Sequence, residues 1–189
     1  MEFEKDIIGC LEVLRRGGII LYPTDTVWGL GCDATNPEAV SKLYSLKQRT
    51  ASKSMIVLLA DRRDLKHYTG RPEPYIETYL EQTTQPITVV YEQALGLADN
   101  LIAEDGTIAI RIVDEVFCRD LIKRFRKPLV STSANISGEE TPVYFRDISD
   151  EVVQGVDYVV KYRQDDSRPS RSSMLIRFSK EGDVVVLRP

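Results

Sequence analysis

Basic and hydroxyl-bearing residues stand close together between positions 24 and 53 of this sequence. Lys47, Arg49 and Lys53 form a basic cluster, and the segments TDT at 24–26 and GLG at 29–31 lie upstream of it. Cations neutralise phosphate charge, threonine hydroxyls bond polar ligands, and glycines let the backbone approach a ligand closely. The segment therefore predicts a site for a small molecule that carries phosphate.

The same residues also have ordinary explanations. Basic residues at the C-terminal end of a helix complement the helix dipole and stay solvated. The threonine- and glycine-bearing segment could be a plain turn. Asp25 is a possible magnesium ligand, but one carboxylate is weak evidence for a metal site.

Two further polar segments lie far along the chain. STSAN at 131–135 follows an apolar strand, and RPSRSS at 168–173 precedes one. Arg111 and Arg188 stand at the ends of two other predicted strands. Hydroxyls and arginines at strand ends favour recognition of phosphate or carboxylate. The alternatives are a hydroxyl-rich turn that caps its own backbone and a solvated surface loop.

The usual catalytic motifs are missing. His67 is the single histidine, and the chain has no GxSxG, HExxH or Walker sequence. A lone histidine is more often structural than catalytic. Any catalysis is therefore expected to depend on positioning and on cations that stabilise developing charge.

Hydrophobic spacing predicts the elements that would position these residues. Helical periodicity covers 3–16, and Asn36-Pro37 marks the start of a second helix. Further helices are expected at 61–68, 72–82, 116–125 and, weakly, 146–153. Strands are expected at 19–22, 55–59, 87–91, 108–112, 129–131, 158–161, 173–177 and 184–187, with 23–34 as a loop.

This mixture predicts one domain over residues 1–189, with an α/β sheet fold. The last strands follow one another without helices, so part of the sheet is expected to be antiparallel. The hydrophobic fraction is 42%, the charged fraction is 29% and the net charge is −4. These values fit an ordinary globular protein and argue against a dedicated nucleic-acid coat protein. The basic run at 123–127 is either a solvated helix end or a tRNA contact.

Cysteine usage and hydropathy favour a cytoplasmic protein. Cys10, Cys32 and Cys118 are odd in number and widely spaced, so they predict reduced, mostly buried thiols rather than zinc ligands or disulfides. The N-terminus lacks the apolar core of a signal peptide, and no apolar run approaches the length of a membrane span.

The motifs together resemble those of the YrdC-like threonylcarbamoyl-adenylate synthases. The matching segments, in order, are PTDTVWGLGCDA at 23–34, SLKQR at 45–49 with Lys53 four residues on, IAIR at 108–111 and STSANISG at 131–138. Order and spacing hold from about Ile8 to the final Leu187-Arg188-Pro189, so the resemblance covers nearly the whole chain. It implies a twisted mixed parallel and antiparallel sheet with flanking helices and a large open cleft.

The resemblance also implies a reaction. L-threonine, bicarbonate and ATP, usually with Mg²⁺, would give threonylcarbamoyl-AMP and pyrophosphate for the t6A modification of tRNA position 37. No enzymic nucleophile is needed, which suits this sequence. The implied partners are ATP, L-threonine and bicarbonate, with tRNA and other proteins of the t6A pathway as further possibilities.

Roles are carried over by motif position. The resemblance implies that Lys47, Arg49 and Lys53 clamp the triphosphate, with Lys47 and Arg49 as the catalytic pair. It implies threonine contacts by Thr26, Arg111, Ser131 and Ser172. It implies ATP contacts by Arg49, Lys53, Thr107, Ser133, Asn135, Thr141 and Arg188, and no protein-held metal.

The chain departs from the family pattern at several positions. Leu58 stands where many members have a histidine that helps to hold threonine, and Arg171 stands where a proline is usual. Thr50 stands where a proline is common, and the segment TQP at 84–86 stands where members often have Pro-Gly-Pro. These departures keep a second hypothesis open: a non-catalytic paralogue of the same fold that binds nucleotide or double-stranded RNA.

Overall fold

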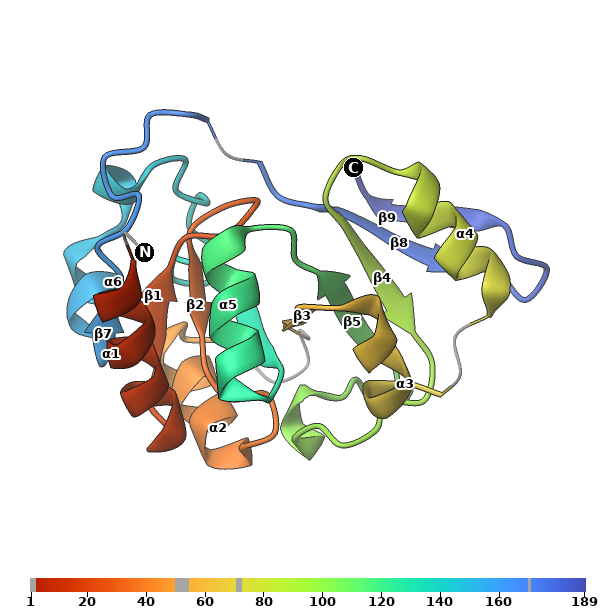
Figure 1. The fold of residues 1–189 in the computed structure, drawn as a ribbon, viewed down its shortest axis with the longest axis horizontal. Helices are drawn as coiled ribbons and strands as arrows, with labels where there is room; N and C mark the ends of the chain where they lie inside the picture. The colour runs from red at the N-terminus through yellow and green to blue at the C-terminus, as the bar shows by residue number, and fades with distance from the viewer. Residues whose placement is uncertain (1–2, 50–54, 71–72, 170) are drawn as a thin grey trace.

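A computed structural model describes residues 3–49, 55–70, 73–169 and 171–189 (Figure 1). The α-helices are α1 (Glu4–Arg15), α2 (Pro37–Leu46), α3 (Leu65–Tyr68), α4 (Pro74–Gln82), α5 (Val116–Phe125) and α6 (Asp150–Gln154). The strands are β1 (Ile20–Tyr22), β2 (Gly29–Gly31), β3 (Ile56–Leu59), β4 (Ile87–Tyr91), β5 (Ile108–Ile112), β6 (Leu129–Ser133), β7 (Tyr158–Val159), β8 (Met174–Phe178) and β9 (Val184–Arg188). Three single-turn 3-10 helices are η1 (Arg62–Asp64), η2 (Asp99–Leu101) and η3 (Phe145–Asp147).

The described strands form one sheet in the order β7-β1-β2-β6-β3-β5-β4-β8-β9. The pairs β1–β7, β3–β5 and β4–β8 are parallel, and the other neighbours are antiparallel. Helices flank this mixed sheet (Figure 1). The predicted fold class is confirmed.

Local sequence explains where the helices begin and which side they bury. The Asn36 side chain accepts hydrogen bonds from the backbone N–H groups of Glu38 and Ala39, and Pro37 occupies the first helical position of α2. In α1 the apolar residues recur at helical spacing, and Ile7, Leu11 and Leu14 are buried. Both helices are therefore fixed by a cap or an apolar stripe that the sequence displays.

Helices α1 and α5 lie side by side on the same face of the sheet (Figure 1). Phe3 meets Phe117 edge to face, with ring centroids 5.6 Å apart. Arg124 on α5 donates to both carboxylate oxygens of Glu4 on α1, at 2.7 and 3.0 Å. The pair covers the half of the sheet that carries β1, β2 and β6.

Most predicted elements are confirmed, and β4, β5 and α5 have the predicted bounds. The expected loop at 23–34 was wrong in part, because it contains β2. Gly29-Leu30-Gly31 has low intrinsic strand propensity, but β1 and β6 pair with it on both sides. A side chain is excluded at Gly31, where a Cβ would lie 2.6 Å from the Val130 carbonyl oxygen.

Three other segments differ more clearly from the prediction, while strands such as β7, which ends at Val159 instead of 161, differ by one or two residues. Strand β6 extends through Ser133, so Thr132 and Ser133 lie in the strand rather than in a following loop. The expected helix at 146–153 is η3 followed by α6, because Ser149 caps a new helix there. The expected helix at 61–68 is likewise divided into η1 and α3.

The described part of the chain contains no helix with the length and apolar character required to cross a membrane. Cys10, Cys32 and Cys118 are all buried thiols, as predicted.

Candidate functional site

A cleft of about 480 Å³ lies where the two halves of the sheet meet, and it collects most of the predicted site residues. Its lining includes Thr26, Arg49, Thr107, Arg111, Ser131, Ser133, Thr141, Ser172 and Arg188. These residues are spread over more than 160 positions of sequence. The structure therefore brings together nine of the twelve side chains expected in one two-ligand site.

A larger cavity of about 660 Å³ lies elsewhere on the molecule. Ile110 and Ile112 of β5 line it, whereas Ala109 and Arg111 line the cleft, so the two cavities lie on opposite faces of that strand. Charged residues at the larger cavity form ion pairs with each other, as Arg63 does with Asp61 and Arg119 with Asp114. The cleft is therefore the better candidate for an anionic ligand.

Strand β6 supplies three hydroxyl residues to the cleft, Ser131, Thr132 and Ser133. Ser131 lies opposite Ile56 of β3, and Ser133 lies opposite Gly29 of β2. Strand β6 pairs with β2 on one side and with β3 on the other. Its hydroxyls therefore lie between the strands that lead to β1 and those that lead to β9. The glycine at 29 leaves room beside the β6 hydroxyls, since a Cβ there would lie 3.2 Å from Ser131 Oγ.

Positive charge dominates the cleft. Four arginines, Arg49, Arg111, Arg177 and Arg188, line it together with one carboxylate, Asp105. Burial lowers the pKa of Arg49, and burial with a smaller contribution from Arg111 lowers the pKa of Arg188. Half-buried cations that repel each other favour the binding of an anion between them.

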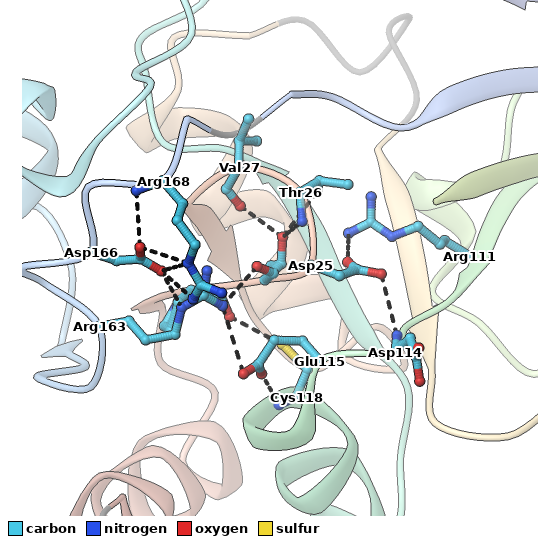
Figure 2. A network of polar contacts seen from close by, with 12 residues as sticks. Asp25, Thr26, Val27, Arg111, Asp114, Glu115, Cys118, Arg163, Asp166 and Arg168 are labelled. Atoms are coloured by element: carbon cyan, nitrogen blue, oxygen red, sulfur yellow. Dashed lines mark hydrogen bonds and ion pairs between the residues drawn. The ribbon is translucent and has the colours of Figure 1, made fainter. Parts of the chain in front are cut away.

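Arg111 is the most deeply placed of these cations. Its side chain is 4% exposed, and Nη2 lies 3.1 Å from Oδ1 of Asp25 (Figure 2). Its buried Nε has no hydrogen-bond partner in the described structure. A buried donor without a partner is costly, so this group is suited to bind a ligand oxygen.

Leu58 and Thr88 flank Arg111 on the neighbouring strands, in direct register with it. Leu58 is fully buried and is not part of the cleft lining. The position where the resemblance implies a histidine is therefore beside Arg111, but an apolar side chain fills it.

Lys47 does not line the cleft. Its Nζ donates to the backbone carbonyls of Ser133 at 2.6 Å and Asn135 at 2.7 Å, and the residue is 1% exposed. Gln48 adopts a left-handed conformation, φ +50°, between Lys47 and Arg49. This turn directs Lys47 behind the loop after β6 and Arg49 into the cleft. Burial, with a smaller contribution from Arg49, lowers the pKa of Lys47 to about 8.

Asn135 also points inward. Its Nδ2 donates to the carbonyls of Ile136 and Glu139, at 3.0 and 2.8 Å. Asn135 is absent from the cleft lining, so its contacts fold the loop that follows β6. The structure thus places Lys47 and Asn135 one layer behind the residues that face the cleft.

Thr26 presents an oxygen acceptor to the cleft. Thr24 Oγ1 donates to the Val27 carbonyl at 2.7 Å and accepts from the Thr26 backbone N–H at 3.0 Å. The two threonine hydroxyls are 2.9 Å apart. Because the Thr24 hydroxyl has given its proton to Val27, Thr26 must donate in that pair. The lone pairs of the Thr26 hydroxyl oxygen are then available to accept from a ligand.

Adjacent serines have different environments at the other side of the cleft. Ser172 is exposed, whereas Ser173 is buried, and its Oγ lies 2.7 Å from Thr88 Oγ1. The Ser173 carbonyl accepts from Arg188 Nη2 at 2.9 Å. The buried serine therefore anchors the start of β8 and helps to direct Arg188.

The remaining predicted residues differ in how well they are held. Thr107 is buried, and its hydroxyl donates to Asp105 Oδ1 at 2.6 Å. Thr141 is exposed at the rim. Lys53 lies outside the described residues.

Two residues of the site received no individual role from the sequence. Thr132 lies in the STSAN segment for which recognition of phosphate or carboxylate was predicted, and the structure shows that its hydroxyl accepts from Arg49 Nη1 at 3.5 Å. Arg177 had no visible motif, although its place in a strand with alternate residues facing the cleft was a usable signal.

Carboxylates are scarce among the described residues that line the cleft. Within the described residues, no group of three or more His, Cys, Asp or Glu side chains is placed to hold a metal ion. The one carboxylate of the cleft, Asp105, accepts from both the N–H and the hydroxyl of Thr107. Mg²⁺ keeps several waters and binds mainly through substrate phosphates in many sites, so these residues fit an ion that arrives with a nucleotide.

Known proteins resemble this chain in sequence over most of its length. The Sua5/YciO/YrdC family model, described as telomere recombination, matches residues 12–189. A protein of Pseudoalteromonas translucida named threonylcarbamoyl-AMP synthase is 32% identical over 163 residues, which cover 85% of this chain and 87% of that protein.

Solved structures show the same fold. The structure of P. abyssi Sua5 complexed with L-threonine superposes with a TM-score of 0.86 at 22% identity. The match covers 98% of this chain and 54% of that one, so the present chain spans about half of the Sua5 chain. E. coli YciO gives a TM-score of 0.83 at 21% identity, over 97% of this chain and 88% of that one.

Proposed function

Because the chain belongs to the Sua5/YciO/YrdC family, we propose that it is an L-threonylcarbamoyladenylate synthase. In this proposal it is a nucleotidyltransferase that forms threonylcarbamoyl-AMP and pyrophosphate from L-threonine, bicarbonate and ATP. The product serves the t6A modification of tRNA, which places the reaction in the cytoplasm. The observation that carries the proposal is the cleft in which arginines and hydroxyls from both halves of the sheet converge.

The amino acid binds at Arg111 in this proposal. The guanidinium pairs with the threonine carboxylate, and its unpartnered Nε supplies one of the donors. Thr26 and Ser131 contribute hydroxyl oxygens from the other half of the sheet, and Ser172 closes the subsite from the segment before β8. The low exposure of Arg111 makes this pairing stronger than it would be in water.

The nucleotide binds along the other part of the cleft. Arg49 and Arg188 face the phosphates, with Lys53 as an expected third cation, and Thr107, Ser133 and Thr141 contact the nucleotide. Lys47 and Asn135 support this subsite from behind through the loop after β6. Arg49 contacts Thr132 of β6 near the middle of the sheet, whereas Arg188 lies on the edge strand β9, so cations from separate parts of the sheet are available to a triphosphate.

The chemistry needs no enzymic nucleophile. Bicarbonate takes up a proton and loses water to give CO₂. The neutral amine of threonine attacks its carbon, and the loss of a proton from nitrogen leaves a carbamate. A carbamate oxygen then attacks the α-phosphorus of ATP, the bond to the bridging oxygen of the β-phosphate breaks, and pyrophosphate leaves. Arg111 holds the first reactant, while Arg49 and Arg188 stabilise charge that moves onto the leaving oxygens. Mg²⁺ bound to ATP supplies further charge neutralisation.

Pyrophosphate release tests the proposal. Purified protein with ATP and Mg²⁺ should release pyrophosphate only when L-threonine and bicarbonate are both present, and mass spectrometry should detect threonylcarbamoyl-AMP. ATP binding without this product would contradict a synthase. Tight tRNA binding that is indifferent to ATP and threonine would instead favour the non-catalytic RNA-binding paralogue.

A further inference from the structure

A long connection runs from β7 at one end of the sheet to β8 near the other end, passing over the top of the molecule in Figure 1. We call its described part, residues 161–169 and 171–173, the strap. The strap carries Ser172, one of the residues that line the cleft. Thr26, on the loop after β1, lines the same cleft.

Arg163 joins the strap to two other segments. Its Nη1 donates to the Thr24 carbonyl at 3.1 Å and lies 3.7 Å from Oε1 of Glu115. Its Nε donates to Asp166 Oδ2 at 3.0 Å (Figure 2). One guanidinium thus contacts the loop after β1, the start of α5 and the strap itself.

The contact with Thr24 reaches Thr26 through a short network. The Thr24 hydroxyl bonds the backbone N–H and the hydroxyl of Thr26, and it donates to the Val27 carbonyl. These bonds make residues 24–27 a compact turn. A group that fixes the Thr24 carbonyl therefore also fixes the direction of the Thr26 hydroxyl.

The contact with Asp166 reaches toward Ser172. Asp166 also accepts from Arg168, through Nε at 2.9 Å and Nη2 at 2.7 Å, and from the Arg168 backbone N–H at 3.0 Å. The two arginines hold the pKa of Asp166 well below its usual range, so it stays ionised. Arg163 and Asp166 thereby hold the strap down to Arg168, four residues before Ser172.

Glu115 fixes the third side of the arrangement. It is the N-cap of α5 and accepts from the Cys118 backbone N–H at 2.8 Å. Burial raises the pKa of Glu115, and Arg163 is the cation beside it. The guanidinium is therefore held between two carboxylates, and its side chain is only 24% exposed.

We propose that Arg163 is a positioning residue for the amino-acid subsite. It sets the distance between Thr26 and Ser172 by clamping the loop after β1 to the strap. It is absent from the lining of the 480 Å³ cleft, although it lines a second cavity of about 450 Å³ that shares Thr26 and Ser172 with that cleft. In this proposal it acts through the residues that it holds. The identity of the amino acid as threonine rests on the proposed function, whereas the clamp itself does not.

The test compares Arg163→Met with Arg124→Met. Arg124 is also an ion-paired arginine, bound to Glu4 and Asp120, but it lies outside the cleft and outside the network around Thr24. We expect Arg163→Met to raise the KM for threonine at least fivefold and to change the KM for ATP less than twofold. Arg163→Lys keeps the charge but loses the several guanidinium nitrogens, so its KM for threonine should be intermediate. Arg124→Met should leave both KM values unchanged.

Hydrogen exchange gives a readout that does not depend on turnover. Amide exchange at residues 24–27 and 164–168 should be faster in Arg163→Met and unchanged in Arg124→Met. An unchanged KM for threonine, equal increases in both KM values, or faster exchange across the whole chain would overturn the proposal. If the wild-type protein releases no threonine-dependent pyrophosphate, the proposed function fails. Amide exchange then tests whether Arg163 holds the loop after β1. Protection at residues 24–27 that is the same in Arg163→Met and in the wild-type protein would refute this role.

Discussion

Oδ1 of Asp25 lies 3.1 Å from Nη2 of Arg111, and this ion pair joins the loop after β1 to strand β5. The other carboxylate oxygen of Asp25 accepts from the Asp114 backbone N–H at 3.2 Å (Figure 2). The side chain of Asp25 is 13% exposed, and that of Arg111 is 4% exposed. Asp25 is thus better described as the group that orients Arg111 than as the magnesium ligand considered from sequence.

Asp25→Asn should weaken threonine binding. The amide still accepts from the Asp114 N–H, but it cannot pair with the buried guanidinium, so Arg111 loses its fixed direction. We expect the KM for threonine to rise about tenfold and the free energy of unfolding to fall by about 1–3 kcal/mol, as for a buried charge that loses its partner. Initial rates and urea denaturation measure the two effects.

Asp114→Asn is the matched control for that variant. The Asp114 side chain is 92% exposed and pairs with Arg119, while only its backbone N–H contacts Asp25. An equal rise in the KM for threonine in both variants would show that the Asp25–Arg111 pair has no particular role.

Arg49→Ala should lose ATP affinity without unfolding the protein. Arg49 is half-buried in the cleft lining, and its positive charge is expected to face the triphosphate. We expect kcat/KM for ATP to fall at least tenfold, which corresponds to about 1.4 kcal/mol or more of transition-state stabilisation. Lys42→Ala on the exposed side of α2, whose Nζ donates to the Gly17 carbonyl, serves as the control. Wild-type rates in Arg49→Ala would contradict a role in ATP binding. They would favour the alternative that Arg49 is a solvated cation at the end of a helix.

Lys47 should contribute a pH dependence to stability. Its pKa is about 8 in the folded protein and 10.5 for an unperturbed lysine. Between these values the unfolded state holds more protons, so the free energy of unfolding should rise with pH. Relative to Lys47→Met, the wild-type protein should gain about 1–3 kcal/mol between pH 7.5 and pH 10.5. Urea denaturation at several pH values measures the difference, and a flat difference would contradict a depressed pKa.

Much of the fold could be predicted because its signals are local. The apolar runs of β4 and β5 and the amphipathic pattern of α5 give their bounds directly. Strand β2 could not be predicted in this way, since its two glycines oppose strand formation and only β1 and β6 stabilise it. Predicting that strand requires knowledge of its partners, which local sequence does not contain.

The site shows the same division. Motif positions placed Arg49, Arg111 and Ser131 among residues that do line one cleft. They did not separate Lys47 from Arg49, because that difference arises from the left-handed turn at Gln48. Arg163 gave no signal at all, since its contact with Thr24 joins residues 139 positions apart. Residues that face a ligand were thus more visible in sequence than residues that hold those residues in place.

The neighbouring serines before β8 should have opposite phenotypes. Ser172 is exposed in the cleft lining, so Ser172→Ala should raise the KM for threonine severalfold and leave the thermal stability unchanged. Ser173 is buried against Thr88 Oγ1 at 2.7 Å, so Ser173→Ala leaves a buried hydroxyl without its partner. That loss should lower the free energy of unfolding by about 1–2 kcal/mol. Steady-state kinetics and thermal unfolding on both variants separate the roles, and a threonine KM that changes only in Ser173→Ala would transfer the ligand contact to the buried serine.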